Sequence, residues 1–282
     1  MSVAVRSSAS GLREGAAGAA PADGPGATPA VLLAIDTSTE TMAVAVVGPR
    51  GACCWNGPGG AAASTHLVPR IHAVLAEAGL ALADVQAIAF GRGPGAFTGL
   101  RTSCAVAQGL GFGLGRPLLP IDSLLIVAED ALGALAVGHE TDRGEPEVAV
   151  AMDARMDEIY GGLYRRSASG WQTVHEAALH TLESWNDLVA RESASLDVMA
   201  GSALAAFGDR LHRPAGARLH GLEVDRAAAL LRLARQVHAA GQGIDAAQAL
   251  PLYLRDKVAL TTAERTAARA AIASTAVPGA RP

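Results

Sequence analysis

The stretch that decides the fold is AIAFGRGPGAFTGLRTSCAVAQGLGFGLGRPLLPIDSL, residues 87–124. Residues 87–90 predict a strand, and the glycine-rich loop after them leads into a helix from about Thr98 to Leu114. A further strand is predicted at 117–121. Strands that alternate with helices in this way are typical of an α/β protein.

Three antiparallel strands are predicted upstream, at 31–36, at 42–47 and in a short run that ends at Trp55. A helix follows from about Leu67 to Ala78, and the glycine after it is a helix stop. The predicted order is therefore βββαβαβ. Strands at 148–152 and 158–164 indicate that a second, similar unit begins there.

We therefore expect a duplicated α/β fold with two domains, residues 31–137 and 146–260. Residues 1–30 are rich in Ala, Gly, Ser and Pro without apolar periodicity, which predicts a disordered extension. Residues 261–282 are expected to form a flexible or helical tail.

The composition limits the kinds of partner. Of the 282 residues, 50% are hydrophobic and 18% are charged, so the chain is able to bury a large core. The net charge of −4 gives no overall basic field, so contact with nucleic acid must come from a local patch or through a partner. Neither a signal-peptide segment nor a run of about 18 apolar residues is present, and a disulfide framework is improbable with three cysteines. We expect a cytoplasmic protein with no membrane contact.

Two predicted hairpin turns carry candidate polar groups. Asp36, Thr37 and Ser38 follow the first strand, where hydroxyls and amides are able to hold phosphate and the carboxylate a hydrated magnesium. The same residue types also fix turns through local hydrogen bonds. Asp153 and Arg155 lie in the corresponding turn of the second unit. They either contribute charge to a cleft or belong to a solvated turn.

The glycine-rich loop at 91–99 joins a strand to a helix, a setting in which backbone amides commonly bind phosphate. It is not a Walker loop, because no Gly-Lys-Ser/Thr follows. Gly91, Gly93 and Ala96 fit a relaxed dinucleotide pattern, with Asp122 as a ribose ligand, but Pro94 interrupts the expected helix start.

The helix after this loop has one face of small residues, Ala105, Gly109 and Gly113. Each interior glycine costs a helix about 1 kcal/mol relative to alanine, so some contact must offset it. Such a face packs closely against either its own domain or another subunit. No histidine or cysteine spacing typical of a metal site and no nucleophile motif is present.

The chain resembles the TsaB family, which are inactive-looking relatives of the sugar kinase, heat-shock ATPase and actin proteins. Four segments carry the resemblance: LLAIDTSTETMAVAVV (32–47), the stretch 87–124, VAMDARMDEIYGGLY (150–164) and PLYLRDKVA (251–259). The resemblance spans roughly 31–260. It implies a duplicated actin-like, ribonuclease H-like fold.

The resemblance also implies a function. A TsaB protein is the non-catalytic dimerisation and scaffold subunit of a complex that makes threonylcarbamoyladenosine in tRNA. Its partners are the catalytic paralogue TsaD, which modifies adenosine 37, the ATPase TsaE, and a second copy of itself; tRNA is contacted only through the complex. No cofactor is expected on this chain alone, since ATP and metal belong to the partner subunits. The alternative is an active ATP-dependent phosphotransferase of the same fold.

The implied sites contain no catalytic and no metal-binding residue. The expected partner interface is Leu67, Ile71, Val74, Leu100, Cys104, Gly109 and Gly113. The loop expected to position the interface helix contains Gly95, Phe97, Thr98, Gly99 and Arg101, and a vestigial nucleotide cleft contains Asp36, Thr37, Ser38, Asp153 and Arg155. Asp157 stands where the family usually has glycine, which requires a turn without a positive φ.

Overall fold

The computed structural model describes residues 30–135 and 144–255, and in these residues the predicted duplication is confirmed. The first half contains β1 (Leu32–Asp36), β2 (Thr41–Gly48), β3 (Gly51–Pro58), α1 (Ala63–Glu77), β4 (Ala87–Gly93), α2 (Phe97–Leu114), β5 (Leu118–Asp122) and α3 (Ser123–Ala134). The second half contains β6 (Glu147–Asp153), β7 (Glu158–Ser167), β8 (Gly170–Thr181), α4 (Leu182–Glu192), β9 (Leu196–Ala200), α5 (Ala203–Phe207), β10 (Arg218–His220) and α6 (Arg226–Ala239). The predictions for 1–29 and 256–282 lie outside the described residues.

Each half forms a five-stranded sheet, and the two sheets have the same topology. The orders are β3-β2-β1-β4-β5 and β10-β9-β6-β7-β8, which match when the second is read from its other end. In each sheet the first three strands pair antiparallel, and the two strands that follow helices pair parallel. This arrangement is the two-domain actin-like fold that the sequence predicts.

Alternating side chains of the first sheet supply two cores, because successive residues of a strand point to opposite faces. Leu33 and Ile35 of β1 pack toward α1 and α2, together with large residues such as Phe90 of β4. The other face is rich in alanine, including Ala34, and lies against α6. Since helices cover both faces, the central strands are buried throughout.

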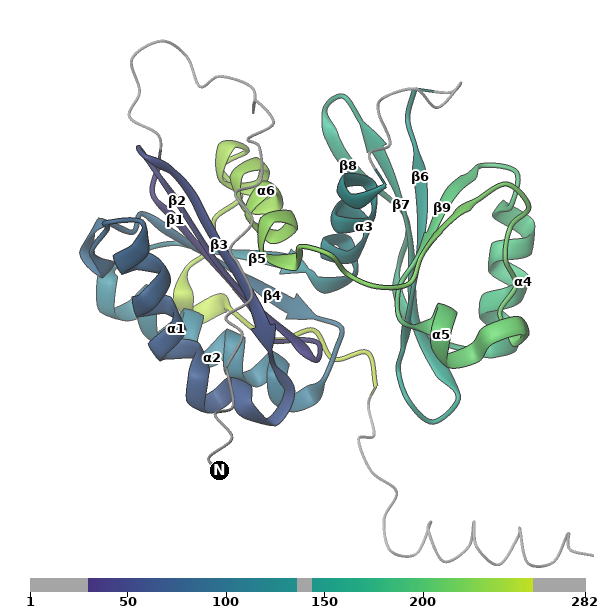
Figure 1. The fold of residues 1–282 in the computed structure, drawn as a ribbon, viewed down its shortest axis with the longest axis horizontal. Helices are drawn as coiled ribbons and strands as arrows, with labels where there is room; N and C mark the ends of the chain where they lie inside the picture. Colours follow the sequence, from purple (N-terminus) through teal and green to yellow (C-terminus); the bar gives the residue numbers. More distant parts are fainter. Residues whose placement is uncertain (1–29, 136–143, 256–282) are drawn as a thin grey trace, which may run out of the picture.

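The two halves exchange their last helices, which lie between the sheets in Figure 1. Helix α6 packs its Leu230 and Ala234 on the first sheet, whereas α3 packs its Val127 and Ala131 on the second. The chain after α6 also stays with the first half, where Ile244 pairs with Leu118. Each sheet with its covering helices therefore takes elements from both halves, and the division into domains at 31–137 and 146–260 stays a prediction.

In the part of the chain that the structure describes, no helix combines the length and the apolar character needed to cross a bilayer.

Candidate functional site

A cleft of about 590 Å³ lies between the two halves. Its walls are the β1–β2 turn, the start of α2, the β6–β7 turn, the loop between β10 and α6, and the last described residues. Ser38 and Gly95 line it from the first half, and Asp153 and Arg155 from the second. Both predicted hairpin turns therefore face the same cleft.

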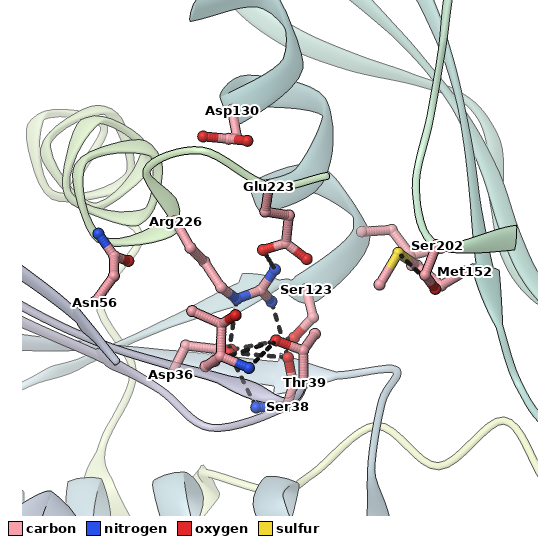
Figure 2. A network of polar contacts seen from close by, with 12 residues as sticks. Asp36, Ser38, Thr39, Asn56, Ser123, Asp130, Met152, Ser202, Glu223 and Arg226 are labelled. Carbon is pink, nitrogen blue, oxygen red and sulfur yellow. Dashed lines mark hydrogen bonds and ion pairs between the residues drawn. The ribbon is translucent and has the colours of Figure 1, made fainter. Parts of the chain in front are cut away.

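Asp36 lies beneath this cleft and is fully buried. Its Oδ1 accepts hydrogen bonds from the Ser38 backbone N–H and hydroxyl, both at 2.9 Å, which is the local turn chemistry considered above. The same oxygen accepts from Nε of Arg226 at 2.9 Å, and the Arg226 side chain is also fully buried (Figure 2). The acid is paired within the chain.

A hydrated magnesium does not fit at Asp36. Arg226 donates in addition to the Ser38 hydroxyl at 2.8 Å and to the Glu223 carboxylate. Burial alone would lower the pKa of the Arg226 guanidinium, but the carboxylates of Asp36 and Glu223 outweigh it and raise that pKa above its ordinary value. A permanent cation therefore stands where a metal ion would have to approach the carboxylate.

The backbone of the β1–β2 turn packs directly against the glycine-rich loop. A Cβ on Gly99 would lie 1.8 Å from the Thr37 carbonyl oxygen, and one on Gly95 would lie 2.4 Å from the Ser38 carbonyl oxygen. The Ala96 amide donates to that Ser38 carbonyl at 2.8 Å, and the Thr37 hydroxyl donates to the Gly99 carbonyl at 2.6 Å. These glycines allow close packing of the turn on the helix start.

Asp122, considered as a ribose ligand, is also engaged within the chain. One oxygen caps α3 by accepting from the Leu124 amide at 2.9 Å, and the other accepts from the Tyr164 hydroxyl at 2.7 Å. Burial raises the pKa of the Asp122 carboxyl, although these hydrogen bonds oppose the rise. The Tyr164 contact joins the two halves, so the role of Asp122 in this structure is structural.

The expected partner interface is only in part exposed. Within residues 30–135 and 144–255, nothing outside the helix's own backbone lies within 4 Å of where a Cβ would stand on Gly109 or Gly113 of α2. The other expected positions lie in the core beneath the helices, because apolar residues at helical spacing face their own sheet: Leu67, Ile71, Val74, Leu100 and Cys104 are at most 3% exposed. These side chains support the helices from inside, and the expected interface stays a prediction.

The outward face of α1 and α2 is hereafter called the pairing face. It consists of Val68 on α1 and Ala105, Gly109, Phe112 and Gly113 on α2. Phe112 is 63% exposed and Val68 44% exposed, and both helices lie on the outer side of the first sheet in Figure 1. Large apolar groups beside bare glycine backbone are typical of a surface that another helix covers.

The loop positions predicted to orient α2 gather at its start. The Arg101 guanidinium lies 3.8 Å from the centre of the Phe97 ring and donates to the Tyr253 hydroxyl at 2.9 Å. The ring centres of Phe97 and Tyr253 are 5.2 Å apart, and Thr98, next to Phe97 in the chain, is exposed. This cluster fastens the last described residues to α2.

Three functional positions escaped sequence reasoning: Arg226, Tyr253 and Arg255. Tyr253 and Arg255 lie in the segment PLYLRDKVA, where no spacing signals their contacts. Arg255 donates to the Ala154 carbonyl at 2.9 Å and pairs with Glu158 at 2.6 Å, so this segment crosses from the first half to the β6–β7 turn.

The β6–β7 turn requires left-handed backbone, contrary to the condition set for Asp157. Arg155, Met156 and Asp157 have φ values of 63°, 56° and 62°. Aspartate tolerates this region better than most residues do, and Arg210 pairs with its carboxylate at 2.7 Å. Asp153 in the same turn accepts from the Arg155 amide at 2.8 Å and from its guanidinium at 3.1 Å.

No group of three or more His, Cys, Asp or Glu side chains suited to a metal ion occurs within residues 30–135 and 144–255.

Comparison with known proteins agrees with this geometry. The family described as "TsaD: tRNA N6-adenosine threonylcarbamoyltransferase" matches residues 60–278. The fold and this match define the class, a two-domain α/β protein of the actin-like, ribonuclease H-like type.

Individual relatives narrow the class. The tRNA threonylcarbamoyladenosine biosynthesis protein TsaB of Escherichia coli (strain K12) is 33% identical over 240 residues, which cover 81% of this chain and 96% of that protein. The Haemophilus influenzae TsaB is 40% identical over 129 residues, covering 46% of this chain and 51% of that one. The structure of YeaZ from Pseudomonas aeruginosa is 35% identical with a TM-score of 0.66, covering 80% of this chain and 100% of that one. The chain belongs to the TsaB family.

Proposed function

We propose that this chain is the non-catalytic dimerisation subunit of the machinery that makes threonylcarbamoyladenosine in tRNA. In this role it pairs with and activates a TsaD subunit, which transfers threonylcarbamoyl to adenosine 37, and a TsaE ATPase completes the assembly. The names of the relatives, tRNA threonylcarbamoyladenosine biosynthesis protein TsaB, support the pathway. The partners are our inference.

The observation that supports pairing is the bare glycine backbone of α2. Gly99 and Gly111 are explained within the chain, because a Cβ at either would collide with its own neighbours. Among the described residues nothing packs over Gly109 or Gly113, so none of them offsets the helix free energy that these glycines cost, about 1 kcal/mol each. A second helix on the pairing face would supply that contact.

The contacts in the cleft do not favour the alternative of an active phosphotransferase. Arg226 holds the Asp36 carboxylate, and the amides at the start of α2 face the β1–β2 turn at close distance. Phosphoryl transfer depends on free charges aimed at the transferring group. We therefore assign no bond-making residue, and we place the chain's role at its surface.

Co-purification with the TsaD of the same organism tests the proposal. Gly109→Leu puts a bulky side chain on the pairing face and also improves helix propensity, so the chain should fold and the pairing should be lost. Ala190→Leu is the matched control, because Ala190 is an exposed position of α4 on the second half. Normal recovery of TsaD with the Gly109 variant would refute the placement of the pairing face.

A further inference from the structure

A buried ion pair between Arg226 and Asp36 joins the two halves next to Ser38 and Glu223, which line the cleft. Arg226 approaches from the start of α6, and Asp36 and Ser38 approach from the β1–β2 turn (Figure 2). All three are at most 1% exposed. A buried charged group of this kind is held only where its partners are well placed, so the position of the guanidinium and that of the turn are coupled.

The second half helps to set the position of Arg226. The residue follows the loop 221–225, which leads out of β10 in the second sheet. Asp130 of α3 holds this loop by accepting from the amides of Val224 and Asp225 at 2.8 and 2.7 Å, and it contacts His220 at 3.1 Å. Helix α3, which packs on the second sheet, therefore holds the segment that leads into Arg226.

The β1–β2 turn in its turn sets the start of α2. The Ala96 amide and the Thr37 hydroxyl make the two hydrogen bonds described above, and Gly95 and Gly99 allow the backbones to touch. A continuous series of buried contacts thus runs from the loop 221–225 through Arg226 and the turn to the helix that carries most of the pairing face.

We infer that Arg226 is a positioning residue for pairing: through Asp36 and Ser38 it fixes the start of α2, and hence the pairing face, without any ligand in the cleft. The guanidinium is a fixed cation beside the Asp36 carboxylate. The inference rests on the proposed function, because pairing is its readout. It goes beyond that function by assigning a distant, buried residue to control of the surface.

The test measures pairing and local exchange in the full chain. Arg226→Met removes the charge but keeps much of the side-chain length. Glu129→Gln is the control, because Glu129 also links the halves, by accepting from the Trp171 indole at 2.7 Å and by pairing with Arg232. In the described residues its hydrogen bonds and ion pairs reach neither the turn nor α2. Binding to the TsaD subunit is titrated by calorimetry under conditions in which every variant is folded.

We expect Arg226→Met to weaken the affinity about tenfold, in the range that substitutions coupled to a distant site produce, and Glu129→Gln to leave it unchanged. Hydrogen exchange should quicken in peptides that contain the start of α2 and not in the rest of that helix. A merely structural role would speed exchange throughout the first half. If Arg226→Met does not fold, Ser38→Ala breaks one contact of the guanidinium and should weaken binding by a smaller factor in the same direction.

Equal affinities for the Arg226 and Glu129 variants would overturn the inference, as would uniform exchange. Failure of the unmodified chain to bind TsaD would instead remove the proposed function. The two failures are therefore distinguished by the wild-type titration alone.

Discussion

Two glycines of α2 should respond to alanine in opposite directions. At Gly99 a Cβ would stand 1.8 Å from the Thr37 carbonyl oxygen, a backbone atom that cannot rotate away. At Gly109 a Cβ would meet nothing within 4 Å in the described part of the chain, apart from the backbone of its own helix. Both positions are helical, so the intrinsic preference for alanine is common to both and the surroundings decide the sign.

The sizes follow from these distances. Ordinary contact begins near 3.4 Å, so the helix start must retreat by about 1.6 Å from the turn in Gly99→Ala. That retreat breaks the hydrogen bonds from the Thr37 hydroxyl and the Ala96 amide, which contribute about 1 kcal/mol each. With overpacking strain of about 1–3 kcal/mol and a helix gain below about 1 kcal/mol, we expect a loss of about 2–4 kcal/mol. Gly109→Ala should gain about 0.5–1 kcal/mol.

Thermal unfolding followed by circular dichroism measures both. In a chain of this size, a change of about 1 kcal/mol in the free energy of unfolding shifts the melting temperature by about 2–4 °C. The Gly99→Ala protein should therefore melt roughly 5–15 °C below wild type, and the Gly109→Ala protein a few degrees above it. A Gly99→Ala protein as stable as wild type would show that the close approach of turn and helix is wrong. A destabilised Gly109→Ala protein would show that the pairing face is covered by the chain itself.

Three further outcomes are expected. Burial raises the pKa of the Asp122 carboxyl, so its charged form destabilises the fold at neutral pH. The Asp122→Asn protein should therefore resist urea better than wild type at pH 7, and this difference in stability should shrink as the pH falls through the raised pKa. A difference that widens as the pH falls would contradict this. Burial, with Glu77 as the second cause, raises the pKa of the Cys53 thiol to about 11. Glu77→Gln should therefore speed alkylation of Cys53 by iodoacetamide at pH 9, followed by mass spectrometry. An unchanged rate would count against the contact between Cys53 and Glu77. Asp36→Ala leaves the buried Arg226 guanidinium without its main partner and should lower the free energy of unfolding by about 3 kcal/mol. Asp153→Ala removes the partner of an exposed arginine and should cost less than about 1 kcal/mol. Similar losses for the two variants in urea unfolding would refute the difference between a buried and an exposed ion pair.

The element order was predictable because its signals are local. Periods of two and of about 3.6 residues are visible within one segment, and so are the turn residues between them, which is why βββαβαβ is confirmed twice. The two hairpin turns were also identified from their own residues. That they face one cleft follows from the duplication, since equivalent turns lie at equivalent edges of the two sheets.

Other features depend on contacts between distant segments. Arg226 is one of 23 Lys and Arg residues, and no local pattern marks it as the one buried against Asp36. The exchange of α3 and α6 between the halves is likewise invisible, because an amphipathic helix does not indicate which sheet it covers. The apolar stripe on α1 shows a related limit: Leu67 and Ile71 face the core, so a partner on the outside of α1 would meet the positions between them.

The two equivalent carboxylates of the cleft are both paired within the chain. Asp36 ends β1 and Asp153 ends β6, so the duplication places one on each side of the cleft. Each is paired with an arginine of this chain, Asp36 with Arg226 across the halves and Asp153 with Arg155 two residues further on. A transferase would need such charges free to act on developing charge in a substrate, whereas a scaffold needs them satisfied so that its shape is constant. Because the more deeply buried pair, Asp36 with Arg226, is the one connected to α2, the proposed scaffold role depends on it more than on the exposed Asp153–Arg155 pair.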